Sequence, residues 1–225
     1  MKHVELAFSV CLRACGLGLS LFFFLVLLGG VPTVGAETKA AAGSLEATLE
    51  RIRNAAAGVQ TISSRMEQEK HLAAFNEVLK TSGRFAFRRP DCWRWELLKP
   101  LTSGISVCGQ NGSRWHENGG RKQFKLADEP WLRHFAVQVT AWTTADFAFL
   151  QKHYVISLLS QSPPSLKLVP KESAARRLIA ALEITFAADY RYVERIVIRE
   201  SGRDYTVTKF LDVHTNEPLP GDFFQ

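Results

Sequence analysis

The chain has 225 residues, of which 46% are hydrophobic and 22% are charged, and its formal net charge is +6. Such a length suits one domain of ordinary size with a real hydrophobic core. The positive charge suits contact with anionic membrane surfaces or acidic partners. It is diffuse, however, and no run of Lys and Arg is interleaved with base-stacking aromatic residues, which argues against nucleic-acid binding.

Residues 1–36 have the organisation of a secretory signal peptide. Lys2 and Arg13 precede an apolar stretch at 17–28, and the small residues Val34-Gly35-Ala36 predict cleavage after Ala36. The apolar stretch is shorter than the roughly 20 residues of a membrane-spanning helix, so a retained anchor is the less favoured alternative. The sequence therefore predicts export across a membrane, followed by removal of the signal.

Cleavage leaves residues 37–225, which we expect to form one domain. Two basic residues and one acidic residue leave with the signal, so the net charge falls from +6 to +5. Residues 37–43 are predicted to be an Ala-rich linker, after which Ser44 begins a helix that runs to about Ala57. The residues on its apolar face are Leu45, Leu49, Ile52 and Ala56.

Period-two alternation of apolar and polar residues, the pattern of a strand with one buried face, begins after this helix. It is weak at 61–69 and strong at 78–88, where Pro90 ends the strand. Two further strands flank the Pro100-Leu101 turn. Hairpin turns are predicted at Gln110-Asn-Gly112 and Asn118-Gly-Gly120. The remaining predicted strands are 114–117, 122–126, 154–159, 166–169, 182–187, 193–200 and 204–211.

The two strands around Pro100-Leu101 can be paired in one register that matches like with like. The predicted pairs are Trp93 with Val107, Trp95 with Ile105, and Cys92 with Cys108. Apolar residues then face each other on one side of the hairpin, and the two thiols face each other on the other side. An oxidising compartment would allow a disulfide between Cys92 and Cys108, and the alternative is a pair of free thiols on the outer face.

Residues 130–150 change from a strand period to a helix period. Apolar residues at spacings of three and four predict two short amphipathic helices, the second capped by Thr143 or Thr144. A helical pair inserted in a series of strands covers either the open face or one end of the sheet. We expect it to act as a lid, with these side chains facing the sheet: Trp131, Leu132, Phe135 and Trp142.

Catalytic motifs are absent from the sequence. It has no Gly-x-Ser-x-Gly elbow and no phosphate-binding glycine loop. The histidines after residue 36 stand singly, and no Cys-x-x-Cys or His-Glu-x-x-His spacing offers a metal site. We therefore expect neither an enzyme nor a metal or other cofactor.

The predicted inner face of the sheet is strongly aromatic, and two interpretations of it remain open. The aromatic residues form a solid core, as such residues often do, or they line a hollow beneath the helical lid. A large apolar face is rarely left open by a soluble monomer, so a covering lid fits the second interpretation. The residues expected to line the hollow are Phe85, Phe87, Trp93, Trp95, Ile105, Val107, Trp115 and Phe124.

Several motifs resemble the LolA-type outer-membrane lipoprotein carriers. The most specific is Phe85-Ala-Phe-Arg-Arg-Pro-Asp-Cys-Trp-Arg-Trp95, in which a strand ends in basic-Arg-Pro and is followed by spaced aromatic residues. The other matching features are the helix at 45–57, Met66-Glu-Gln68, Asn111-Gly-Ser-Arg-Trp115, and the closing Asn216-Glu-Pro-Leu with Phe223-Phe224. The resemblance extends over essentially the whole of residues 37–225.

This resemblance implies an α+β fold, in which an incomplete β-barrel of about eleven strands is lidded by helices over an apolar cavity for acyl chains. It implies that Arg89 is a gate that holds the lid shut, and that Trp93 takes part in handing over the cargo. The implied function is periplasmic transport of a lipoprotein or another lipid by a monomer, from an inner-membrane donor to an outer-membrane acceptor. The alternative is a non-carrier envelope sensor or interaction protein on the same fold.

Overall fold

The computed structural model describes residues 35–74 and 77–224. The predicted signal peptide therefore lies outside the described residues, apart from Gly35 and Ala36. No helix in the described part of the chain combines the length and the apolarity needed to cross a membrane.

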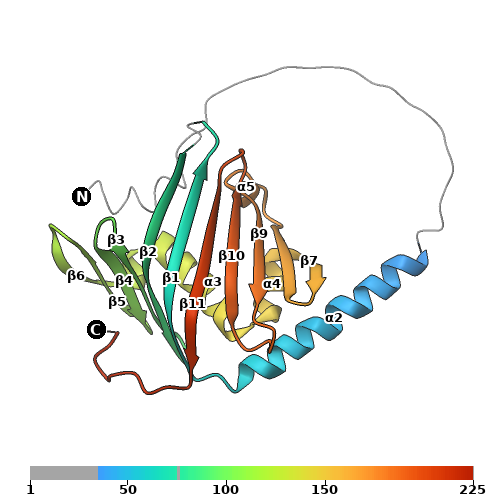
Figure 1. Cartoon of the computed structure of the whole chain (residues 1–225), viewed down its shortest axis with the longest axis horizontal. Coiled ribbons are helices and arrows are strands. Elements are labelled where there is room, and N and C mark those ends of the chain that lie inside the picture. Colours follow the sequence, from blue (N-terminus) through green and yellow to red (C-terminus); the bar gives the residue numbers. More distant parts are fainter. Residues whose placement is uncertain (1–34, 75–76, 225) are drawn as a thin grey trace.

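Eleven antiparallel strands form a single sheet (Figure 1). Their spatial order is β6-β5-β4-β3-β2-β1-β11-β10-β9-β8-β7, so β6 and β7 are the two edges and the curved sheet does not close into a barrel. This confirms the predicted architecture. The strands are β1 (Thr61–Leu72), β2 (Glu77–Arg88), β3 (Cys92–Lys99), β4 (Ser103–Cys108), β5 (Asn111–His116), β6 (Gly120–Lys125), β7 (Tyr154–Gln161), β8 (Pro164–Pro170), β9 (Ile179–Phe186), β10 (Val193–Glu200) and β11 (Tyr205–Thr215).

The register predicted for the β3–β4 hairpin is confirmed, because Trp93 pairs with Val107 and Trp95 pairs with Ile105. Cys92 and Cys108, at the open end of this hairpin, are joined by a disulfide. The next turn differs from the prediction. It lies at Gly109–Gln110, where Gly109 has a φ of 61°, and not at residues 110–112, which instead lead into β5.

Helix α2 (Gly35–Ala57) begins earlier than the sequence predicts. Residues 37–43 are helical, which corrects their prediction as a linker, because a run rich in alanine has a high helix propensity. The predicted apolar face is present, since Leu49, Ile52 and Ala56 are buried in the main core.

The inserted segment forms helices α3 (Pro130–Thr144) and α4 (Phe147–His153), after the short 3₁₀ helix η1 (Leu126–Asp128). The α4 cap is Asp146, whose side chain accepts a hydrogen bond from the Phe149 amide at 3.0 Å. This corrects the prediction of Thr143 or Thr144 as the cap, because both hydroxyls donate back to carbonyls inside α3. A further short helix, α5 (Ser173–Arg176), lies between β8 and β9.

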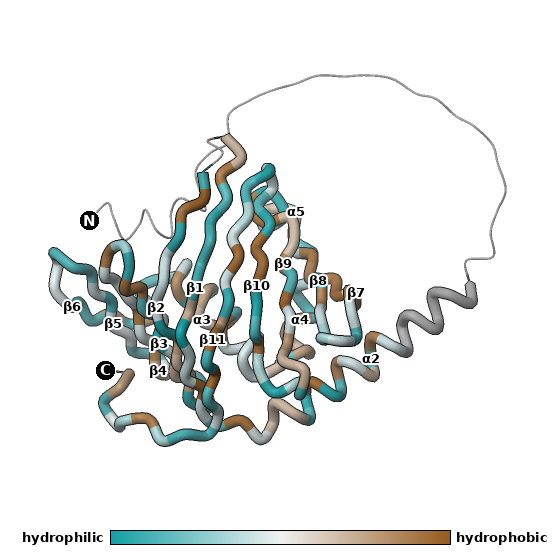
Figure 2. Tube along the Cα trace, viewed as in Figure 1, coloured by the Kyte–Doolittle hydropathy of each residue, from teal (hydrophilic) through white to brown (hydrophobic). Residues whose placement is uncertain are grey.

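Helices α3 and α4 lie on one face of the sheet, which we call the inner face (Figure 1). Hydrophobic and hydrophilic residues alternate along the strands (Figure 2), as expected for a sheet with one buried face. The main core contains buried residues from α2, α3, α4 and the inner face of the sheet. The insertion between the two edge strands therefore covers the apolar side of an open sheet.

Candidate functional site

The inner face of β2 and β3 meets α3 through aromatic rings. Phe135 of α3 contacts Trp93 and Trp95 of β3, with ring centroids 5.6 and 6.4 Å apart. Phe87 and Trp93 have no exposed surface, and Val107 is almost as deeply buried. Leu132 of α3 is also fully buried. These residues make a close-packed contact between the sheet and α3, so this end of the predicted hollow is filled.

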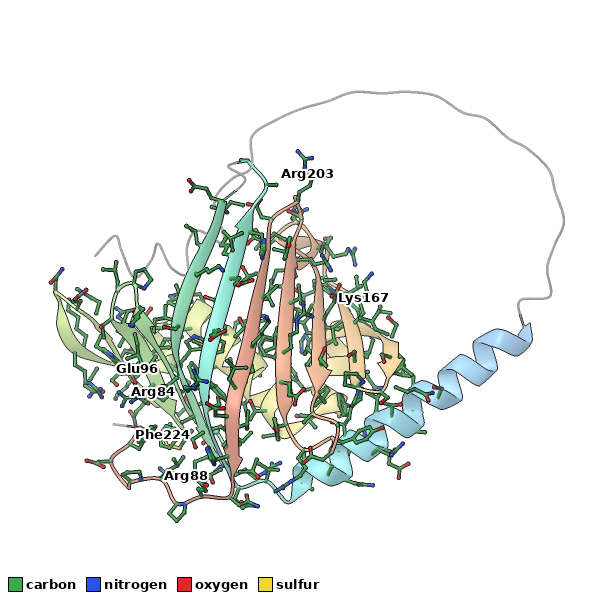
Figure 3. All side chains as sticks on the ribbon, viewed as in Figure 1. Arg84, Arg88, Glu96, Lys167, Arg203 and Phe224 are labelled. Atoms are coloured by element: carbon green, nitrogen blue, oxygen red, sulfur yellow. A yellow bond between two sulfur atoms is a disulfide. The ribbon has the colours of Figure 1, made fainter. Side chains whose placement is uncertain are left out.

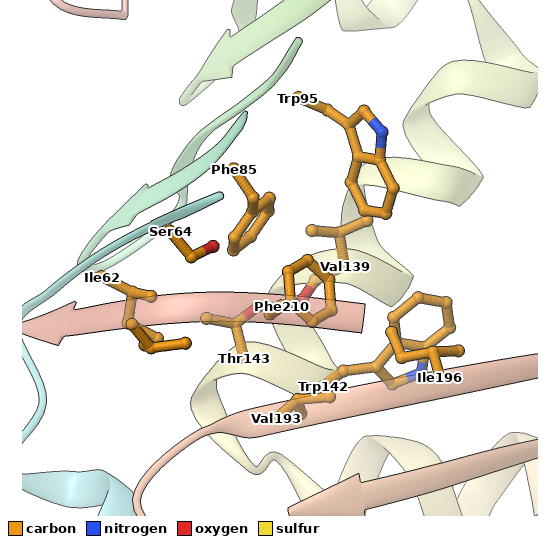
Figure 4. Close-up of a pocket in the computed structure, with 11 residues that line it drawn as sticks. Ile62, Ser64, Phe85, Trp95, Val139, Trp142, Thr143, Val193, Ile196 and Phe210 are labelled. Carbon is orange, nitrogen blue, oxygen red and sulfur yellow. Dashed lines mark hydrogen bonds between the residues drawn. The ribbon is translucent and has the colours of Figure 1, made fainter. Parts of the chain in front are cut away.

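A small apolar cavity remains farther along the inner face, between α3 and the central strands (Figure 4). About 400 Å³ is free of atoms when the open mouth is included. The part that the centre of a water-sized sphere can reach is about 20 Å³, which is room for roughly one water molecule. The lining residues are Ile62, Ser64, Phe85, Trp95, Val139, Trp142, Thr143, Val193, Ile196, Phe210 and Val213.

The structure brings only part of the predicted cavity set to this space. Phe85 and Trp95 line the cavity from the sheet, and Trp142 lines it from α3. Phe85 and Trp95 also contact each other, with ring centroids 5.7 Å apart. The other inward residues of the predicted set, Phe87, Trp93, Ile105 and Val107, belong to the adjoining packed core.

Trp115 lies on the outer face of the sheet, which corrects its prediction as a cavity residue. Its ring covers Gly104 and lies between the guanidinium groups of Arg94 and Arg121, each 4.5 Å from the ring centroid. The hairpin register already requires this position. Ile105 points inward and pairs with Arg114, so the neighbouring residue Trp115 must point outward.

Phe124 of β6 does point inward, but it lies outside the cavity. It pairs with Gly112, where its ring fills the space that a side chain would need, and the Arg114 guanidinium lies 5.8 Å from the ring centroid. Arg114 also forms an ion pair with Glu129 at 3.0 Å, just before α3 begins. Phe124 therefore packs at the edge of the sheet, near the start of the lid.

Trp131 does not cover the inner face, which corrects its prediction as a lid side chain. It is 52% exposed, and its indole N–H donates to Glu129 at 3.2 Å. Trp131 lies in the first turn of α3, beside Glu129. Leu132 and Phe135 face the sheet, and Trp131, one position before Leu132, is rotated about 100° away from that face.

The other half of the cavity comes from strands that the sequence reasoning did not connect with the site. Residues of β1, β10 and β11 continue the sheet wall beyond Phe85 and Trp95. Strand alternation indicated Ile62 and Ser64, which are two positions apart on β1. It could not indicate both Val193 and Ile196, or both Phe210 and Val213, because each pair is three positions apart and the strands carry register shifts there. These residues are Ile62, Ser64, Val193, Ile196, Phe210 and Val213.

Arg89, the predicted gate, binds the end of α2. Its Nε donates to the Val59 carbonyl at 2.7 Å and its Nη2 donates to the Ala56 carbonyl at 2.9 Å. Carbonyl groups at a helix C-terminus lack partners within the helix and attract cations. These carbonyls belong to α2 and the turn after it, so the hydrogen bonds of Arg89 hold α2 and not the predicted lid helix α3. Helix α2 in turn packs against α3.

Tyr154, the first residue of β7, ties α3 to the sheet. Its hydroxyl donates to Gln138 Oε1 at 3.0 Å, and both side chains are buried. Burial raises the pKa of Tyr154 to about 12, with a smaller contribution from the charge of Glu172. The tyrosine therefore stays neutral and keeps its donated bond throughout the physiological pH range.

The outer face of the β2–β4 region is covered by the C-terminal tail (Figure 3). Phe224 is buried against Ala86 and Cys92, and its carbonyl accepts a hydrogen bond from Ser106 Oγ at 2.8 Å. The Arg94 guanidinium donates to the Phe223 carbonyl at 3.1 Å. The tail therefore shields the disulfide on the side of the sheet away from the cavity.

Within the described ranges, no group of three or more His, Cys, Asp or Glu side chains is placed to hold a metal ion. The cavity on the inner face is instead mostly apolar. Apart from Ser64 and Thr143, its walls are aliphatic and aromatic, and one wall belongs to the inserted helix α3 rather than to the sheet.

The chain resembles a known protein family in sequence and several solved structures in fold. The family model described as "Outer membrane lipoprotein carrier protein LolA" matches residues 57–225. The sequence has no significant match among curated proteins. An uncharacterized conserved protein from Thermus thermophilus is similar in structure, with a TM-score of 0.50, 10% identity, and coverage of 81% of this chain and 93% of its own.

Two other solved structures align with most of the chain. The Mycobacterium tuberculosis lipoprotein LppX aligns with 11% identity and a TM-score of 0.44, covering 79% of this chain and 98% of its own. The Pseudomonas aeruginosa MucA/MucB complex contains a chain with 14% identity and a TM-score of 0.47, with coverage of 81% of this chain and 60% of that one. Since the family model spans most of the sequence, the chain belongs to the LolA family of outer-membrane lipoprotein carrier proteins.

Proposed function

We propose that the protein is a periplasmic carrier that binds the acyl chains of a lipoprotein or another lipid beneath α3. It acts as a monomer, takes its cargo from an inner-membrane donor and delivers it to an outer-membrane acceptor. The segment 1–36 serves as the cleaved export signal. The protein performs no catalysis and needs no cofactor.

The observation that carries this proposal is the composition of the cavity walls. The sheet contributes Phe85, Trp95 and Phe210, and the lid helix contributes Val139 and Trp142. The lid side chains occupy the space that an acyl chain would fill. An accessible volume near 20 Å³ is far too small for such a chain, so binding requires α3 to move away from the sheet.

The energies involved are compatible with reversible binding. A buried methylene contributes about 0.8 kcal/mol, so a C16 chain that leaves a membrane loses on the order of 12 kcal/mol. The opened cavity supplies apolar surface that replaces much of this loss. Re-exposing each large lid side chain costs about 1.5–3 kcal/mol, which keeps net binding weak enough for release.

Extraction of the natively purified protein with organic solvent tests the proposal. Mass spectrometry of the extract should identify acyl lipid in near-stoichiometric amount. As a matched control, Val193→Asp places a charge on the cavity wall and should lose the lipid, whereas Val155→Asp changes an exposed valine of β7 and should retain it.

The carrier proposal would be contradicted if the extract holds no lipid and excess acyl ligands fail to displace a bound hydrophobic dye. Recovery of a membrane protein in the same purification, again without lipid, would favour the alternative role as an envelope sensor.

A further inference from the structure

Two polar groups on the cavity walls have no protein partner. Ser64 Oγ and Trp142 Nε1 are buried and make no hydrogen bond with the described residues, and both residues line the cavity (Figure 4). Each residue is only 8% exposed. Buried hydroxyl and indole N–H groups are normally paired, so two unpaired groups around one small cavity call for a physical explanation.

Two other buried groups in the described part of the chain are also unpaired, but they belong elsewhere. Trp93 Nε1 lies in the packed core, and Arg94 Nε lies on the outer face, where the rest of the guanidinium binds Glu96 and the tail. Neither residue lines the cavity. The third polar residue of the wall, Thr143, donates to the Val139 carbonyl at 2.8 Å and so is satisfied within its own helix.

Ser64 lies beside an irregularity in the pairing of β1 with β11. Ser64 pairs with Phe85 of β2, which fixes its side chain on the inner face. On the other side, the register between β1 and β11 shifts between Ser63 and Arg65, so Ser64 has no direct partner on β11. Two residues of β11 therefore oppose Ser64, namely Asp212, with a φ of 49°, and Val213 of the cavity wall. Such bulges redirect side chains near binding sites.

Ser64 and Trp142 approach the cavity from different walls, one from the rigid sheet and the other from the lid helix. A purely hydrocarbon ligand would leave both donors unpaired. A carbonyl oxygen has two lone pairs and can accept from a hydroxyl and an indole N–H. We propose that the cavity recognises an acyl chain by its carbonyl group, with the oxygen accepting hydrogen bonds from Ser64 of the sheet and from Trp142 of the displaced α3.

This inference rests on the proposed carrier function and narrows its cargo to acyl esters, acyl amides or free fatty acids. The hydrogen bond between the carbonyl and Ser64 would fix how far the acyl chain enters the cavity, because Ser64 belongs to the sheet and does not move with α3. The contact from Trp142 would make the position of α3 in the bound form depend on the polar end of the ligand as well as on its hydrocarbon.

Displacement of the dye bis-ANS by length-matched ligands tests the inference. Methyl laurate carries the carbonyl, and dodecane is the hydrocarbon without it. In Ser64→Ala, the affinity for methyl laurate should fall about three- to tenfold, the range expected for one net hydrogen bond. The affinity for dodecane should stay unchanged, and Trp142→Phe should show the same selectivity.

Ser157→Ala is the matched control, since this serine is exposed on β7 and should leave both affinities unchanged. Circular dichroism and cooperative unfolding verify that each variant is folded. Lauric acid and N-methyl lauramide, compared in the same assay, distinguish a free carboxyl group from an ester or amide bond.

Equal effects on methyl laurate and dodecane in both folded variants, or no effect on either, would overturn the carbonyl inference while leaving the carrier intact. Failure of every ligand to displace the dye from the unmodified protein would instead overturn the carrier proposal itself.

Discussion

Two tryptophans of helix α3 have opposite environments, and this contrast defines the lid at the level of single residues. Trp142 is 8% exposed and lines the cavity, whereas Trp131 is 52% exposed. The two residues are eleven positions apart, which at about 100° per residue puts them within about 20° of the same helix face, so their position around the helix does not separate them. Their contacts with different neighbours decide which of them is buried.

Trp142→Ala should destabilise the protein and open the cavity. Loss of the buried indole should lower the free energy of unfolding by about 3–5 kcal/mol, and the space left should increase bis-ANS binding. Trp131→Ala should change the free energy of unfolding by less than about 0.5 kcal/mol. Urea unfolding and dye titration measure both effects. Dye binding that is equal in the two variants would contradict the assignment of Trp142 to the cavity wall.

The tie between Tyr154 and α3 should break at high pH. Its pKa of about 12 in the folded state exceeds the ordinary value of 10, so the unfolded state ionises first as the pH rises. The stabilisation is therefore complete below pH 10 and is lost between pH 10 and 12, by up to about 2–3 kcal/mol. In Tyr154→Phe, unfolding measured across this range should lack that part of the decrease. An identical dependence of unfolding on pH in the two proteins would contradict the raised pKa of Tyr154.

At the residue scale, the sequence predicted the pairs of the β3–β4 hairpin but misplaced two tryptophans. Trp93 and Trp95 could be placed because a short turn fixes the parity of both strands. The same parity argument, continued to β5, places Trp115 outward, whereas hydrophobicity alone places it inward. The cation–π contacts with Arg94 and Arg121 show how an aromatic ring is accommodated on an outer face.

At the scale of elements, α2 is anchored to the sheet through Arg89. Arg89→Leu removes two charge-assisted hydrogen bonds to helix carbonyls, each contributing roughly 1.5–3 kcal/mol. Hydrogen exchange should accelerate in the C-terminal turns of α2. Because α2 packs on α3, the variant should also stabilise the closed, ligand-free position of α3 less well. Return to that position accompanies release, so acyl ligand should be released more slowly.

Arg84→Leu provides the matched control for Arg89, since Arg84 is an exposed arginine of the same strand region. Its exchange pattern and release rate should equal those of the unmodified protein. Unchanged exchange in α2 of the Arg89 variant would show that the arginine does not anchor the helix, and unchanged release would rule out a gating role.

The disulfide of the β3–β4 hairpin is an element-scale constraint. It joins residues 16 positions apart, and closing a loop of that length should stabilise the fold by about 3 kcal/mol through the unfolded chain. The Cys92→Ala/Cys108→Ala variant should therefore unfold at lower urea concentration. A midpoint equal to that of the unmodified protein would show that the bond is absent or contributes nothing.

Element types are predictable from this sequence because period and spacing are local properties. The sequence locates all the strands and the helical pair, while element boundaries shift by a few residues. The exceptions have local causes as well. Residues 37–43 lack the apolar periodicity that marks a buried helix, and the helix cap at Asp146 is hidden by the two neighbouring threonines.

At the scale of the whole molecule, the fold combines an open sheet with a cover drawn from the chain between its two edge strands. The sequence could not show how completely α3 fills the space over the inner face of the sheet, because that depends on contacts between α3 and strands far away in the chain. Ile196 and Phe210 reach the cavity only after β10 and β11 have paired with β1. In the resulting closed form the cavity wall is mostly apolar, but the cavity is too small for an acyl chain.

The central claim is that α3 leaves the sheet when an acyl chain binds. Spin labels at Val137 of α3 and Leu101 of the β3–β4 turn, both exposed, report the distance between lid and sheet by pulsed electron paramagnetic resonance. A label pair at Leu101 and Val155 controls for movement within the sheet. Acyl lipid should lengthen the first distance and leave the second unchanged. An unchanged first distance, with lipid demonstrably bound at saturation, would contradict the claim.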